Sequence, residues 1–84
     1  MIRVRYFAWV RERVGAAEES IELPTAVQSV GDLIAFLAAR DEAHGAAFAE
    51  PSVIRAALDR DHVDHDAPLG PAREVAFFPP MTGG

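Results

Sequence analysis

Cysteine and lysine are both missing from the sequence, and each absence excludes a type of chemistry. Without cysteine, the chain can form no disulfide, no thiolate metal site and no iron–sulfur cluster, and it has no thiol nucleophile. Without lysine, the eight basic residues are all arginines, so copies of the chain cannot be linked to one another through side-chain amines. Any nucleophile that the protein uses must therefore be a different group.

Length and charge exclude further classes of function. The 84 residues suffice for one domain with one core, and a domain this small buries only about 60–65% of its unfolded surface, which leaves little material for a deep catalytic cleft. The formal net charge of −5, without a basic stripe, argues against nucleic-acid binding. Arginines alternate with apolar residues near the N-terminus, a pattern that fits neither a signal peptide nor a membrane span. We therefore expect a cytoplasmic protein without a membrane partner.

Hydrophobic periodicity predicts the secondary structure of most of the chain. Apolar residues alternate with a period of two where strands are expected. These strands are predicted at residues 2–7, 19–23, 53–58, around 63 and 74–78. Residues 8–14 contain no helix breaker and are followed by Gly15, so they predict a short helix with a glycine C-cap.

The clearest helix signal begins at Ser29, which can cap a helix together with Asp32 three residues later. Four apolar residues then follow with the spacing i, i+3, i+4 and i+7, namely Val30, Leu33, Ile34 and Leu37. We expect this helix to span residues 30–40. Residues 44–50 are expected to form a loop or a short helical turn that ends at Pro51.

This order of elements predicts an α+β domain with a ubiquitin-like β-grasp fold. In that arrangement a mixed sheet of four to five strands packs on one long helix, and the last strand lies beside the first. We expect the folded domain to cover residues 1–78 and a flexible Gly-Gly tail to cover residues 79–84.

The tail is the most informative segment for function. Pro79 and Pro80 cannot donate to a strand ladder, so the sheet must stop there, and prolines favour an extended chain. At roughly 3.1 Å per residue, the six residues from Pro79 could project about 18 Å beyond the domain. Met81 and Thr82 lead to Gly83 and Gly84, whose lack of a Cβ makes the tip thin. Glycine pairs are also common in frayed chain ends, so the pair alone is not specific.

The tail and the N-terminal segment together carry a resemblance to a known family. Residues 74–84 read Glu-Val-Ala-Phe-Phe-Pro-Pro-Met-Thr-Gly-Gly, which resembles the end of the small subunits of molybdopterin synthases. The usual family residue at the position of Met81 is valine. Residues 4–15 are similar to the first strand and short helix of the same family. The resemblance covers nearly the whole chain, although the middle matches only in its pattern.

This resemblance implies a defined chemistry for Gly84. In the family, an activating enzyme related to ubiquitin-activating enzymes adenylates the terminal glycine with ATP and magnesium, and a sulfurtransferase or other sulfur donor converts the adenylate to a thiocarboxylate. The tail, here residues 79–83, carries the sulfur into the large subunit of the synthase. There the sulfur is transferred to cyclic pyranopterin monophosphate. The resemblance implies an assembly of two small and two large subunits, no cofactor bound to the small subunit, and catalytic groups in the large subunit.

Alternation along the strands predicts a surface for these partners. Phe77 is in phase with Val75 and should be a core residue, whereas Phe78 should face outward. Phe7 has the same phase on the first strand, so Phe7 and Phe78 are expected to form an exposed apolar patch for partner binding. His62 aligns with a bulky apolar residue of the family's patch and is included in the prediction. The alternative is that the short helix or the loop before Pro51 covers one of the two rings.

Two further parts of the sequence have residue types that occur at functional sites. His62, Asp64, His65 and Asp66 alternate like metal ligands, but the sequence offers no second half of a site, so we expect no bound metal. Trp9 is either a core cover or an interface residue, and the sequence does not decide between them.

Three other functions remain open at this point. The chain could carry sulfur for thiamine or amino-acid biosynthesis, although thiamine carriers are usually shorter and lack both the short helix and the Phe-Phe-Pro-Pro approach to the tail. It could be a protein modifier that forms amide bonds with other proteins. It could also be a ubiquitin-like binding module whose tail is inert.

Overall fold

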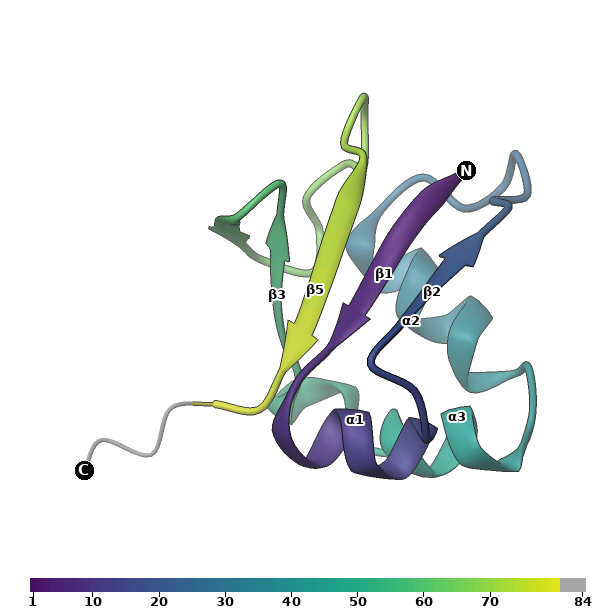
Figure 1. Ribbon diagram of the computed structural model, residues 1–84. Coiled ribbons are helices and arrows are strands. Elements are labelled where there is room, and N and C mark those ends of the chain that lie inside the picture. The colour runs from purple at the N-terminus through teal and green to yellow at the C-terminus, as the bar shows by residue number, and fades with distance from the viewer. Residues whose placement is uncertain (81–84) are drawn as a thin grey trace.

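The computed structural model describes residues 1–80, which form a five-stranded sheet with helices on one of its faces (Figure 1). The strands are β1 (Ile2–Tyr6), β2 (Glu18–Ile21), β3 (Arg55–Leu58), β4 (Asp61–Val63) and β5 (Glu74–Phe78). The helices are α1 (Ala8–Val14), α2 (Val30–Ala38) and α3 (Glu42–Ala47), followed by the 3₁₀ helix η1 (Pro51–Val53).

The sheet has the order β2-β1-β5-β3-β4 and is mixed, as predicted for a β-grasp fold. The central strands β1 and β5 are parallel, with Val4 opposite Val75 and Tyr6 opposite Phe77. The other neighbouring strands are antiparallel. Because β1 and β5 run in the same direction, the N-terminus and the start of the tail lie at opposite ends of the sheet (Figure 1).

The core lies between the sheet and the helices, and it contains the residues that alternation assigned to it. Val4, Val75 and Phe77 have no exposed surface, so the prediction that Phe77 is a core residue is confirmed. The ring of Phe77 packs edge-on against Phe48 with 5.2 Å between centroids, and Phe48 packs in the same way against Tyr6 at 6.3 Å. These aromatic contacts join β1 and β5 to the segment after α3.

The two predicted helices form, and their ends follow from local chemistry. Ser29 Oγ accepts a hydrogen bond from the Asp32 N–H at 3.1 Å, and Asp32 Oδ2 accepts one from the Ser29 N–H at 3.2 Å, which completes the expected capping box. The helix α1 ends at Gly15, whose φ of 88° permits the left-handed C-cap conformation. The helix α2 ends at Ala38, two residues before the predicted end.

The prediction of one long helix is wrong. The longest helix among residues 1–80 is α2, which has nine residues, and a further helix, α3, occupies much of the segment expected to be a loop or single turn. Asp41 caps α3 by accepting a hydrogen bond from the His44 N–H at 2.8 Å. Ala47 and Phe48 are buried at its end, so tertiary packing stabilises a segment whose own periodicity is weak.

Two strands also differ in their bounds. The second strand begins at Glu18 and ends at Ile21, one and two residues respectively before the predicted limits. The third begins at Arg55 because Pro51 starts a turn of 3₁₀ helix that takes up the residues expected to begin the strand.

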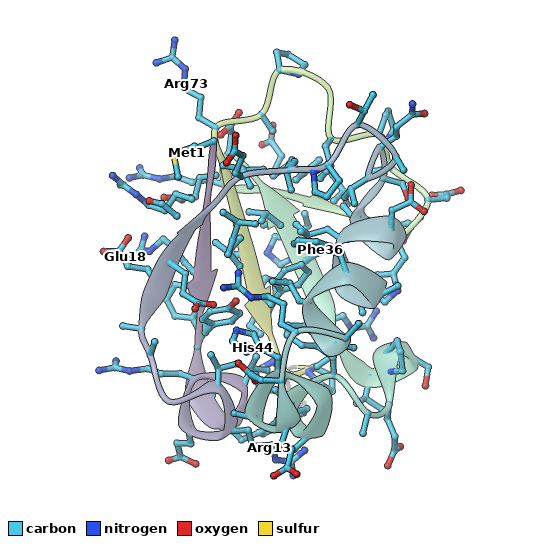
Figure 2. The ribbon with its side chains drawn as sticks, turned by 90° about the vertical axis from the view of Figure 1, so that its right-hand side faces the viewer. Met1, Arg13, Glu18, Phe36, His44 and Arg73 are labelled. Carbon is cyan, nitrogen blue, oxygen red and sulfur yellow. The ribbon has the colours of Figure 1, made fainter. Side chains whose placement is uncertain are left out.

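A buried histidine fastens α3 to the sheet. His44, which is labelled in Figure 2, is only 5% exposed. Its Nε2 lies 2.7 Å from Glu19 Oε2 on β2, and its Nδ1 lies 2.8 Å from Asp41 Oδ1. The hydroxyl of Tyr6 donates to the same Glu19 oxygen at 2.7 Å. Burial alone would lower the pKa of His44, but its hydrogen bonds to Glu19 and Asp41 outweigh burial and raise it. Burial would raise the pKa of Glu19, yet hydrogen bonds from His44 and Tyr6 lower it.

Because of this cluster, we expect the free energy of unfolding to be highest in a mildly acidic pH range and to fall at both lower and higher pH. A raised His44 pKa stabilises the fold fully below the ordinary histidine value of about 6.5 and loses that effect as pH rises through the folded-state pKa. The lowered carboxylate pKa values of Glu19 and Asp41 stabilise the fold above their ordinary values and lose that effect as pH falls. We expect the Tm to drop between pH 6 and pH 9 by about 4–8 °C, which corresponds to about 1 kcal/mol for this size.

The control is His44→Gln, which keeps a polar side chain but cannot become charged. Thermal unfolding followed by circular dichroism should show a lower Tm for this variant at pH 6 and a flatter profile from pH 6 to pH 9. An equal fall in Tm for both proteins would show that His44 does not cause the pH dependence.

The hairpin that carries β4 contains a strained turn. Its two central residues, Asp59 and Arg60, have φ values of 47° and 76°, as a type I′ turn requires. Asp59 is suited to this position because its Oδ1 accepts hydrogen bonds from the backbone N–H groups of Arg73 and Glu74, both at 3.1 Å. Arg60 has a Cβ atom, so its positive φ costs free energy that glycine would not lose.

We therefore expect Arg60→Gly to stabilise the protein by about 0.5–1 kcal/mol. Arg3→Gly is the matched control, because Arg3 lies in the extended backbone of β1, where glycine should destabilise by a similar amount. Chemical denaturation of both variants would measure the effect. A loss of stability in Arg60→Gly would contradict the strain at this turn.

Candidate functional site

The tail leaves the sheet at the point where β1 gives way to α1 (Figure 1). The Phe7 N–H donates a hydrogen bond to the Phe77 carbonyl oxygen at 3.1 Å, close to the end of the ladder between the two central strands. Phe78 ends β5, and Pro79 and Pro80 then continue outside the sheet, as predicted from their missing N–H groups. Both prolines are half-buried.

The other tail residues lie outside the described part of the chain. Met81, Thr82, Gly83 and Gly84 were assigned to tail insertion and to the reactive terminus on the sequence alone, and those assignments remain predictions. The same holds for the division into a domain of residues 1–78 and a tail of residues 79–84.

Of the three residues predicted to bind partners, His62 and Phe78 lie against each other on the outer face of the sheet, and Phe7 follows the end of the neighbouring strand β1. The ring of His62 lies 5.1 Å from the ring of Phe78 at an angle of 57°. Phe7 is 40% exposed, and the guanidinium carbon of Arg5 lies 5.2 Å from the centre of its ring. Phe7 follows the end of β1 and acts as the N-cap residue of α1, so its placement in the first strand was wrong. Its extended backbone, with φ −130° and ψ 155°, continues the alternation of β1.

Small alanine side chains occupy the outer face of the sheet beside its aromatic residues. Ala57 on β3 is paired with Ala76 on β5 and with His62 on β4, and it is only 5% exposed although it lies outside the hydrophobic core. Arg5 and Arg55 border the face on β1 and β3. Aromatic residues and arginines, which are enriched at protein interfaces, therefore lie around the alanines of this face.

A hollow of about 340 Å³ lies on the other side of the tail base. Its lining includes Trp9 and Arg13 from α1, Ala47 at the end of α3, Glu50, Val53 in η1, and Pro80. The guanidinium carbon of Arg13 lies 4.3 Å from the centre of the Trp9 ring. Trp9 also packs against the core, so it is both a core cover and a surface residue. The sequence could not reveal this hollow because its two walls are more than thirty residues apart in the chain.

The two histidines of the possible metal-ligand pattern make other contacts. His65 Nε2 lies 2.7 Å from the Ile54 carbonyl oxygen, and the ring of His62 is tilted against the ring of Phe78. Within residues 1–80, no group of three or more histidine, aspartate or glutamate side chains is placed to hold a metal ion. The same residues contain no helix that is long and apolar enough to cross a membrane.

Comparisons with known proteins give a consistent result. The model of the ThiS family matches residues 4–84. The chain is 42% identical over 86 aligned positions to the molybdopterin synthase sulfur carrier subunit of Escherichia coli K12, with full coverage of both chains. It is 33% identical to the protein of the same name from Mycosarcoma maydis, covering 99% of this chain and 92% of that one. A solved structure described as molybdopterin converting factor, subunit 1, from Pyrococcus furiosus superimposes with a TM-score of 0.74 at 30% identity, covering 95% of this chain and 97% of the other.

Proposed function

The chain belongs to the ThiS family, and from this membership we propose that it is the sulfur carrier subunit of a molybdopterin synthase, with the Gly84 carboxyl group as the carrier of sulfur. The observation that carries the proposal is the full-length identity of 42% to a relative of that name, together with a family match that extends through Gly84. This match supports the resemblance seen in residues 4–15 and 74–84.

The proposed chemistry begins with activation of the Gly84 carboxylate. A carboxylate is a poor electrophile, because its oxygen is a poor leaving group. In the proposed cycle, an adenylyltransferase related to ubiquitin-activating enzymes uses ATP and magnesium to convert the Gly84 carboxylate into an acyl-adenylate. A sulfur donor, supplied by a sulfurtransferase, then replaces AMP and leaves a terminal thiocarboxylate. The thiocarboxylate sulfur is a soft nucleophile in a chain that has no thiol of its own.

The acceptor in this proposal is cyclic pyranopterin monophosphate, which needs two sulfur atoms to form the dithiolene of molybdopterin. Two loaded carriers are therefore required for each product. We expect the large subunit to provide the pocket, the general acids and the general bases. The chain described here would donate sulfur without a complete active site, in a cytoplasmic assembly of two small and two large subunits.

The outer face of the sheet is the proposed docking surface for both partners. Phe7, Phe78 and His62 supply aromatic area beside the tail base, which favours a partner that receives residues 79–83 in an extended form. Because the activating enzyme and the large subunit must each reach Gly84 past this base, they would use the face in turn.

Loading of the purified chain tests the proposal directly. The full chain is incubated with the activating enzyme and sulfurtransferase of its own organism, ATP, magnesium and a sulfur source, and its intact mass is measured. The expected product is heavier by the difference between one sulfur and one oxygen atom, located at Gly84 by fragmentation. Addition of the large subunit and cyclic pyranopterin monophosphate should return the free carboxylate. A chain that binds partners but is never loaded would instead be a binding module.

A further inference from the structure

Only Phe7 separates the central strand β1 from the helix α1 (Figure 1). Its N–H donates to the Phe77 carbonyl oxygen at 3.1 Å, which continues the pairing with β5. Its own carbonyl oxygen accepts hydrogen bonds from the N–H groups of Val10 at 3.1 Å and Arg11 at 3.3 Å, which close the first turn of α1. The backbone of Phe7 is therefore bound to the sheet on one side and to the helix on the other.

The residue that follows this double anchor has a strained backbone. Ala8 has a φ of 51°, in the left-handed region that a residue with a Cβ atom enters only at a cost in free energy. Within residues 1–80, the other such non-glycine residues are Asp59 and Arg60, whose hairpin turn requires this conformation. The side chain of Ala8 is exposed, so packing of its own methyl group does not explain the strain.

The conformation of Ala8 lets the chain keep both anchors of Phe7. The helix α1 buries Val10 and Val14 in the core, so the chain must turn back over the core directly after Phe7 has bonded to β5. A right-handed conformation at Ala8 would turn α1 in another direction. Either the hydrogen bond to Phe77 or the burial of Val10 and Val14 would then be lost.

This arrangement holds the ring of Phe7 at the surface. The ring is 40% exposed, and the guanidinium carbon of Arg5 lies 5.2 Å from its centre. An aromatic ring on a fixed backbone loses little conformational freedom when a partner covers it, and binding is stronger for that reason. Strained backbone that persists because its surroundings require it is also found preferentially at functional sites.

We propose that Ala8 is a positioning residue of the docking surface, and that its left-handed backbone holds Phe7 in the orientation that a partner protein recognises. The inference rests on the proposed function, in which Phe7 contacts the activating enzyme and the large subunit. It adds that the conformation of residue 8, rather than the chemistry of its side chain, sets the affinity for these partners.

Three substitutions of Ala8 separate conformation from side-chain chemistry. Ala8→Val introduces a β-branched side chain that strongly disfavours a positive φ, whereas Ala8→Asn introduces a side chain that is common in the left-handed region. Ala8→Gly removes the strain. Arg60→Val is the matched control, because Arg60 is also exposed with a positive φ but lies at the opposite end of β3 from the residue paired with Phe78.

Partner affinity is the first readout, measured by calorimetry of the full chain with the purified large subunit. We expect the Kd of Ala8→Val to rise about tenfold, as when an aromatic residue of an interface is displaced. The Kd values of Ala8→Asn, Ala8→Gly and Arg60→Val should stay within about twofold of the original, as for most surface substitutions. Rescue by asparagine would show that the backbone conformation, and not the methyl group of Ala8, is required.

Hydrogen exchange of the free chain is the second readout and needs no partner. The Phe7 N–H should exchange about tenfold faster in Ala8→Val than in the unchanged chain, because its bond to Phe77 opens when residue 8 leaves the left-handed region. It should be unchanged in Ala8→Asn and Arg60→Val. The Tyr6 N–H, which donates to the Ala17 carbonyl oxygen at 2.9 Å, is the internal reference.

Several results would overturn the proposal. These are equal Kd values for Ala8→Val and Arg60→Val, a loss of binding in Ala8→Asn, and equal exchange of the Phe7 N–H in all variants. If Ala8→Val does not fold, Ala8→Gly still provides a test, because its Tm should rise by roughly 2–8 °C and a fall would show that Ala8 is not strained. A failure of the proposed function is distinguishable, since the unchanged chain itself would then not bind the large subunit.

Discussion

One alanine added after Gly84 is expected to reduce sulfur loading by at least about a hundredfold, with no change in Tm. The added residue moves the terminal carboxyl group by about 3.5 Å along an extended chain. Misplacement of a reacting group by about 1 Å can already cost a hundredfold in rate, because reaction requires a near-attack geometry. Deletion of Gly84 shortens the reach by the same amount and should have the same effect. Intact mass after loading measures both variants.

The control for this prediction keeps the length of the tail. Met81→Val introduces the residue that the family resemblance leads us to expect at this position, and it should load at close to the original rate. Thermal unfolding of each variant tests whether the tail contributes to stability. Loading of the alanine-extended chain at the original rate would mean that the terminal carboxyl group is not the reactant. A Tm several degrees lower would mean that the tail packs on the domain.

Phe78→Asp should weaken binding to the activating enzyme and to the large subunit by about thirtyfold or more. Loss of an aromatic residue at the centre of an interface typically costs at least about 2 kcal/mol. The new carboxylate would also face the partner beside His62, whose ring now packs on Phe78. Because Phe78 is half-buried on the outer face rather than in the core, we expect the stability of the isolated chain to fall by only about 1 kcal/mol.

Phe36→Asp provides a matched comparison on the opposite side of the sheet. Phe36 is also half-buried, but it lies on α2, away from the outer face (Figure 2). This variant should lose stability and retain partner binding, as measured by calorimetry with each partner. Unfolding of Phe78→Asp in isolation would show that Phe78 is needed for the core. Equal loss of binding in both variants would show that the outer face is not the docking surface.

Local sequence patterns determined the central strands, the start of the longest helix and the point at which the tail leaves the sheet. Period-two alternation identified β1 and β5 and assigned Phe77 to the core, because successive side chains of a strand must point to opposite faces. The capping box at Ser29 and Asp32 marked the start of α2, since both partners of these hydrogen bonds lie within one turn. The prolines at 79 and 80 marked the end of the sheet, because they lack the donors that a ladder needs.

Only the tertiary structure decided the features that depend on contacts between distant segments. The helix α3 forms around His44, which is held by Glu19 twenty-five residues earlier, and no local pattern shows such a partner. The strand register placed His62 against Phe78, and the packing of α1 near η1 created the hollow beside Pro80. Periodicity and capping act over a few residues, whereas these arrangements exist only once the core has brought separate elements together.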